Sequence, residues 1–147
     1  MLILPGPPAL SAFRLAKLAE RLEAVDPGIR LTGARHVHFA QLQGSMADGQ
    51  RAVLDSLLAY GGVAPESGGE LASAPGETLL LAVPRPGTVS PWASKATDIA
   101  HRCGLDALHR LERGVAYTLF LPAGLSEAQT AAVRALLFDR MTETLLD

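Results

Sequence analysis

The sequence is poor in cysteine and carries almost no excess charge, and each shortage excludes a class of protein. Cys103 is the single cysteine, so no internal disulfide and no thiolate zinc site can form. The net charge of −2 gives no general attraction to nucleic acid or to anionic lipid. No apolar run approaches the roughly 20 residues that span a bilayer. We therefore expect a soluble, cytoplasmic protein that binds neither nucleic acid nor membrane.

What the sequence does contain is typical of a globular domain that alternates strands with helices. Apolar patterning predicts strands over residues 2–4, 29–42, 78–83 and 107–121. The prolines between Pro5 and Pro8 are expected to stop the first strand. Capping residues predict four helices, which begin after Ser11, at Asp48, after Ser90 and after Ser126 and extend to about residues 25, 60, 103 and 141.

The two halves of the chain share this element order and some local detail. A Pro-Gly pair precedes a serine cap in both, and an aromatic residue follows two positions later: Ser11 with Phe13, and Ser90 with Trp92. This repetition predicts an α+β fold of two similar strand-helix-strand-helix lobes, related by a pseudo-twofold axis, with antiparallel sheets covered by helices.

A segment rich in Gly, Pro, Ser and Ala separates the two halves. It contains almost no large apolar side chains, which is typical of a flexible linker. The predicted organisation is therefore a first lobe over residues 1–62, a linker over residues 63–77 and a second lobe over residues 78–147, which together make one domain.

Asp98, His101 and Cys103 are the nearest approach to a catalytic set. Residues two apart on a helix point about 200° apart, so His101 cannot serve Cys103 as a base. A helix C-terminus also disfavours a thiolate. We expect Cys103 to be a small buried apolar residue and predict no catalytic residues in this chain.

His36 and His38 alternate along a predicted strand and so face the same side. Two imidazoles could begin a metal site, but no third ligand is suitably spaced. A polar strand face is the preferred interpretation, and neither a metal nor a cofactor is expected.

The segment from Arg85 to Leu105 is unusually rich in proline, tryptophan and charge. A tryptophan in such surroundings favours an interface anchor. The candidate interface residues are Arg85, Pro86, Thr88, Ser90, Trp92, Lys95, Asp98 and His101. The alternative is a small self-contained enzyme or anion-binding module that uses the helix start at Ser90 with Arg85, Lys95, Asp98 and His101. Arg85 and Lys95 would assist the free backbone N–H groups there in holding an anion.

The run from Pro84 to Leu105 closely resembles the N-terminal domain of the large, single-chain phosphoribosylformylglycinamidine synthase. Its sequence is Pro-Arg-Pro-Gly-Thr-Val-Ser-Pro-Trp-Ala-Ser-Lys-Ala-Thr-Asp-Ile-Ala-His-Arg-Cys-Gly-Leu. Residues 8–14, 37–39, 111–117 and 138–144 resemble the same family in the same order. The chain departs from the family pattern at Pro5, Pro7, Ala93 and Arg102.

The resemblance implies a non-catalytic scaffold domain of a purine-biosynthesis ligase. Enzymes of this family convert formylglycinamide ribonucleotide, glutamine and ATP, with magnesium, into formylglycinamidine ribonucleotide. Their ATP site lies in a synthetase region and their Cys-His-Glu set in a glutaminase, and neither region is in this sequence. The N-terminal domain resembles a fused pair of the small subunit of multi-subunit forms. We therefore expect one domain of a longer enzyme, inactive alone, which docks synthetase to glutaminase and helps to form the ammonia path.

Overall fold

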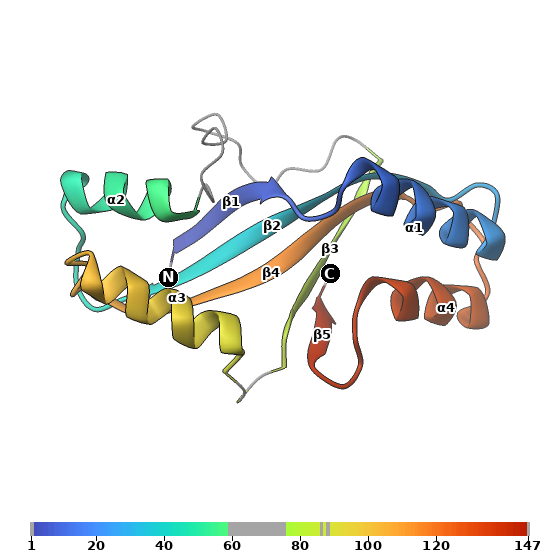
Figure 1. The fold of residues 1–147 in the computed structure, drawn as a ribbon. Helices are drawn as coiled ribbons and strands as arrows, with labels where there is room; N and C mark the ends of the chain where they lie inside the picture. The colour runs from blue at the N-terminus through green and yellow to red at the C-terminus, as the bar shows by residue number, and fades with distance from the viewer. Residues whose placement is uncertain (1, 59–75, 86, 88, 147) are drawn as a thin grey trace.

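The computed structural model describes residues 2–58, 76–85, 87 and 89–146. Within these ranges four helices accompany one five-stranded antiparallel sheet of order β1-β2-β4-β3-β5 (Figure 1). The strands are β1 Leu2–Pro8, β2 Arg30–Leu42, β3 Thr78–Pro84, β4 Leu108–Phe120 and β5 Glu143–Leu146. The helices are α1 Ala12–Val25, α2 Asp48–Leu58, α3 Pro91–Arg102 and α4 Glu127–Leu137.

The long strands β2 and β4 form the centre of the sheet. They pair over almost their whole length, from Arg30 opposite Phe120 to Leu42 opposite Leu108. Each is flanked by the first strand of its own half, β1 beside β2 and β3 beside β4. The predicted α+β class with an antiparallel sheet is confirmed. The division into two symmetric lobes stays a prediction, and most of the predicted linker lies outside the described residues.

The first strand is longer than the sequence predicted. It continues through its prolines to Pro8, with a register shift between Pro5 and Pro8. Proline lacks the N–H that a central strand must donate, but β1 is an edge strand and needs partners on one side only. Arg35 of β2 donates from Nε and Nη2 to the carbonyl of Gly6, both at 3.2 Å. The prediction that the prolines stop the strand was wrong.

The end of the chain also differs from the expected single long helix. Helix α4 ends at Leu137, and the strand β5 follows. A turn separates them, in which the N–H of Asp139 donates to Oε1 of Glu143 at 2.9 Å. The N–H of Met141 donates to Oδ1 of Asp139 at 2.9 Å. These side-chain acceptors close a turn in place of the last helical turns.

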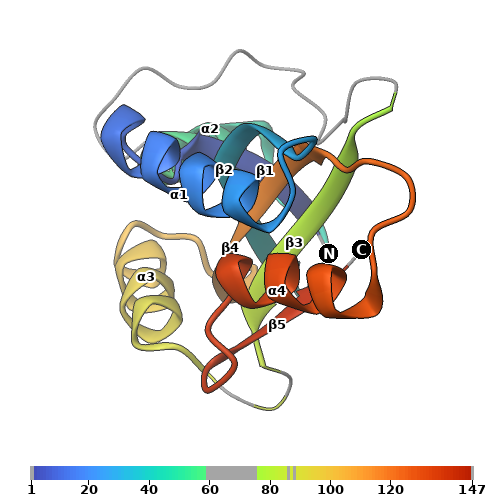
Figure 2. The same cartoon turned by 90° about the vertical axis from the view of Figure 1, so that its right-hand side faces the viewer.

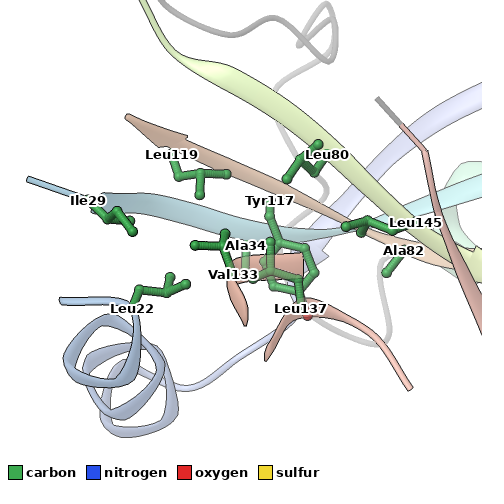
Figure 3. Close-up of a cluster of buried hydrophobic side chains, with 10 residues drawn as sticks. All are labelled: Leu22, Ile29, Ala34, Leu80, Ala82, Tyr117, Leu119, Val133, Leu137 and Leu145. Atoms are coloured by element: carbon green, nitrogen blue, oxygen red, sulfur yellow. The ribbon is translucent and has the colours of Figure 1, made fainter. Parts of the chain in front are cut away.

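Two apolar clusters hold the helices against the sheet. Ala34 and Ala40 of β2 lie in different clusters, yet they are six residues apart and therefore share one face. Figure 1 shows α1 and α4 near one end of the sheet and α2 and α3 near the other, and in the view of Figure 2 α1 and α3 lie on the same side of the sheet. Figure 3 shows the cluster under α1 and α4: Leu22, Ile29, Ala34, Leu80, Ala82, Tyr117, Leu119, Val133, Leu137 and Leu145. Polar residues of the same face lie between the two clusters.

Candidate functional site

Imidazole and guanidinium groups occupy the middle of the helix-covered face. His36 and His38 lie on that face of β2 because they alternate with residues of the opposite face. Arg113 of β4 is the register partner of His38, and Val115 is the partner of His36. His36, His38 and Arg113 therefore form a polar strip across the sheet. It lies between the helices α1 and α4 at one end of the sheet and the helices α2 and α3 at the other.

A cavity of about 470 Å³ lies over this strip. It is bounded by β2 and β4, the start of α3, the end of β3 and the turn before β5. Its lining residues are His36, Pro84, Val89, Ser90, Pro91, Trp92, Arg113, Gly114, Val115, Met141, Thr142 and Glu143. The volume is in the range of small-molecule pockets and of clefts that admit a few side chains.

Trp92, in the first turn of α3, contacts two polar neighbours. Its ring stacks on His38 with centroids 5.7 Å apart and planes inclined by 28°. The guanidinium carbon of Arg113 lies 4.7 Å from the centroid of the same indole. A cation over an indole face is attracted by the negative face of the ring. The indole therefore fixes the position of Arg113 beside the cavity.

Both histidines of the strip are held in the neutral form. Burial, together with His36 and Arg113, lowers the pKa of His38 to about 4. Burial and the charge of Arg113 also lower the pKa of His36. A buried imidazole loses the hydration that stabilises its charged form, and a neighbouring cation disfavours that form further. Near neutral pH, Arg113 is the positive charge of this strip.

Glu112 fixes the start of α3 to the strand β4. Its Oε1 accepts from the hydroxyl of Ser90 at 2.8 Å and from the backbone N–H of Arg113 at 2.9 Å. Its Oε2 accepts from Arg110 at 3.0 Å. The Ser90 hydroxyl also accepts from the N–H of Ala93, as an N-cap does. This nearly buried carboxylate is satisfied by three donors.

Helix α3 also supplies hydrogen-bond partners to backbone groups at the edge of β4. Strand β3 pairs with β4 only from Val115 to Leu119, so the earlier part of β4 lacks that neighbour. There the N–H of Leu111 donates to Oγ1 of Thr97 at 3.1 Å. One helical turn later, Nε2 of His101 lies 2.7 Å from the carbonyl of Leu108. Side chains of α3 replace a strand at this edge.

A second, smaller cavity lies on another side of Trp92. Its volume is about 260 Å³, and its lining is almost entirely apolar: Leu57, Leu58, Trp92, Lys95, Ala96, Ile99 and Leu111. It lies between the helices α2 and α3, whose buried residues Leu54, Leu58 and Ala100 belong to the second core cluster. Trp92 therefore contributes to both cavities.

The structure brings together some of the predicted interface residues. Ser90 and Trp92 line the larger cavity, and Trp92 and Lys95 line the smaller one. Arg85, Asp98 and His101 are exposed and line neither. Pro86 and Thr88 lie outside the described residues.

Sequence reasoning did not include His36, Arg113 and Glu143 in the candidate site, although they line the larger cavity. A signal for Arg113 was present, because the first half of β4 contains Arg110, Glu112 and Arg113 and the second half is mostly apolar. Strand register, which a single sequence does not reveal, decides that His38 and Arg113 meet at Trp92.

The polar groups of Ser90 and His101 are engaged in hydrogen bonds within the domain. The hydroxyl of Ser90 is bonded to Glu112 and Ala93, and the His101 ring is bonded to Leu108. Cys103 is exposed at the end of α3, so the prediction that it is buried was wrong.

In the described part of the chain, no three His, Cys, Asp or Glu side chains form a cluster that could hold a metal. No described helix is long and apolar enough to cross a membrane.

These observations define a small α+β domain, with an antiparallel sheet covered by helices and a polar strip at its centre. Residues 35–147, more than half of the chain, match the family model described as formylglycinamide ribonucleotide amidotransferase N-terminal. The chain belongs to this family, which places it in purine biosynthesis and confirms the resemblance found in the sequence.

Proposed function

We propose that this chain is a non-catalytic coupling domain of a formylglycinamide ribonucleotide amidotransferase. It docks the synthetase region to the glutaminase region of the same polypeptide and helps to form the path of ammonia between them. ATP and magnesium act in the synthetase region, outside this chain. The family supports the parent reaction, and the surface around Trp92 supports the docking role.

The observation that carries the proposal is a set of exposed apolar side chains around Trp92. Val89 is 59% exposed and Met141 is 82% exposed, and both line the larger cavity. Ile99 is 42% exposed and lines the smaller one. Large apolar groups gathered around two adjacent cavities are typical of a surface that a partner covers. An apolar surface of this kind suits a contact between domains.

The experiment compares two nitrogen sources in the full-length polypeptide. A coupling domain is needed when glutamine supplies the nitrogen, because ammonia must then travel between sites. It is not needed when an ammonium salt supplies it. We expect Met141→Asp to lower glutamine-dependent product formation at least about tenfold, which corresponds to a loss of about 1.4 kcal/mol of coupling, and to leave ammonium-dependent product formation unchanged.

The matched control is Phe13→Asp. Phe13 is 69% exposed on α1 and lines neither cavity, so the same charge is introduced away from the proposed contact. We expect this variant to keep both activities. Equal glutamine-dependent rates for the two variants and the unmodified enzyme would contradict the coupling role.

A further inference from the structure

Arg113 is a half-buried cation without a carboxylate partner inside the described ranges. The salt bridges there join Arg51 to Asp55 and Arg110 to Glu112. The guanidinium of Arg113 is held over Trp92 beside the larger cavity. Burying a charge without a counter-charge is costly, so a guanidinium in this position favours an anion that arrives from outside.

The two carboxylates closest to this arrangement are engaged elsewhere. Glu112 is next to Arg113 on β4, and its carboxylate accepts from Ser90, from Arg110 and from the backbone N–H of Arg113. Glu143 lines the cavity, but its Oε1 accepts from the backbone N–H of Asp139. Neither lies within salt-bridge distance of the Arg113 guanidinium.

The cavity suits a carboxylate better than a phosphate. A phosphate site usually combines several donors, often the free N–H groups of a helix start. Here Pro91 occupies the first helical position and has no N–H, and the N–H of Ala93 donates to Ser90. The neutral imidazole of His36 adds no charge. One guanidinium remains, and it can bind a carboxylate by two parallel hydrogen bonds.

The rim of the cavity is apolar. Val89 and Met141 project at its mouth with most of their surface exposed, and Pro84, Pro91 and Val115 contribute to its walls. A free small anion would leave these side chains in water. An acidic residue with apolar neighbours in a polypeptide would satisfy the guanidinium and cover the rim together.

We propose that this cavity receives an aspartate or glutamate side chain, flanked by apolar residues, from the synthetase or glutaminase region of the same polypeptide. The carboxylate binds the Arg113 guanidinium, and the flanking residues cover Val89 and Met141. This inference rests on the proposed docking role and names the anchor of the contact.

The test is photo-crosslinking within the full-length polypeptide. A photoreactive phenylalanine analogue replaces Met141 at the cavity mouth, and the crosslinked peptides are identified by mass spectrometry. We expect a crosslink to a segment outside residues 1–147 that contains Asp or Glu between apolar residues. The same analogue at Phe13 is the matched control, and it should not label that segment.

Substitution of Arg113 then tests the charge. Arg113→Gln should lower the yield of the crosslink at least about tenfold, the ratio expected for losing a charge-assisted hydrogen bond, while Arg113→Lys, which keeps the charge but not the paired hydrogen bonds, should give a yield between the two. Val89→Asp places a negative charge at the rim without touching the strand, so it should lower the yield even where Arg113→Gln folds poorly.

Three results would overturn the inference: crosslinks confined to residues 1–147, crosslinks between two copies of the chain, or competition of the crosslink by millimolar inorganic phosphate, which would make the cavity a free-anion site. The proposed function would survive each of them if Met141→Asp still removed glutamine-dependent but not ammonium-dependent product formation.

Discussion

The imidazole of His38 stacks on the indole of Trp92, although the two residues come from opposite halves of the chain. His38 is fully buried in β2, and Trp92 begins α3. The contact joins a strand of the first half to a helix of the second, and Arg113 of β4 lies on the same indole. The polar strip therefore depends on the position of each of these groups.

Gly6 leaves the space that His38 occupies. A Cβ atom at position 6 would lie 2.6 Å from Cε1 of His38 and 3.1 Å from the carbonyl oxygen of His36. The stacked ring and the backbone cannot both move away. We expect Gly6→Ala to lower the free energy of unfolding by about 1–3 kcal/mol, the usual cost of overpacking, as measured by urea denaturation.

Gly49 provides the matched control for that substitution. It lies in α2, and a Cβ atom there meets nothing within 4 Å. Because alanine is the better helix former, Gly49→Ala should raise the unfolding free energy by up to about 1 kcal/mol. Similar effects of the two substitutions would show that the space at Gly6 is not limiting.

The buried imidazole of His38 makes stability depend on pH. Its pKa in the folded chain is about 4, below the ordinary value of 6.5. Between these two values the unfolded chain binds a proton that the folded chain does not, so the unfolding free energy falls as the pH falls from about 6.5 to about 4. The loss should approach about 3 kcal/mol and level off below pH 4.

Variants at two histidines separate this effect from other titrations. His38→Phe keeps an aromatic ring against Trp92 and removes the titrating group, so stability should vary less between pH 6.5 and 4. His109 is exposed, and His109→Gln should leave the pH dependence unchanged. Thermal unfolding at several pH values measures the stability of both variants. If the stability of His38→Phe changed with pH as steeply as that of His109→Gln, the role given to His38 would be refuted.

Glu112 should contribute strongly to stability through its three donors. Glu112→Ala leaves the Ser90 hydroxyl, the N–H of Arg113 and the Arg110 guanidinium without their acceptor. We expect a loss of about 3 kcal/mol. Glu112→Gln keeps an oxygen acceptor at Oε1 and should lose about 1 kcal/mol. Denaturant unfolding of both variants and of the unmodified chain measures these losses. A Glu112→Gln variant more stable than the unmodified chain would show that the carboxylate charge is unfavourable.

The contact of Thr97 with the β4 edge can be tested at a single amide. Thr97→Val removes the acceptor of the Leu111 N–H and should cost about 1–3 kcal/mol. Thr97→Ser retains the hydroxyl and serves as the control. Amide hydrogen exchange should become faster at Leu111 in the valine variant alone. Unchanged exchange would mean that the edge is protected by packing instead of by this hydrogen bond.

Local signals predicted the helix starts correctly. Ser11, Ser90 and Ser126 each accept a hydrogen bond from the N–H three residues later, as their sequence positions indicated. A cap depends on neighbours within one turn, which the sequence contains. The strand β1 and the turn before β5 depend on their position in the sheet, and there prediction failed.

The candidate site was predicted in part for the same reason. Ser90 and Trp92 were found because their motif is continuous in the sequence. Arg113 was not found, because it reaches Trp92 only through the pairing of β4 with β2. The two residues are 21 positions apart, and no periodicity connects them. Residues that meet across strands are the part of a site that a single sequence leaves open.

The long ladder between β2 and β4 affects how the chain is made. Residues 30–42 leave the ribosome well before residues 108–120, their partners in the centre of the sheet. Because domains are synthesised from the N-terminus at about 5–20 residues per second, β2 waits several seconds with one edge unpaired. An open strand edge is a template for association with other chains. The newly made protein is therefore most vulnerable to aggregation during this interval, before its second half has emerged.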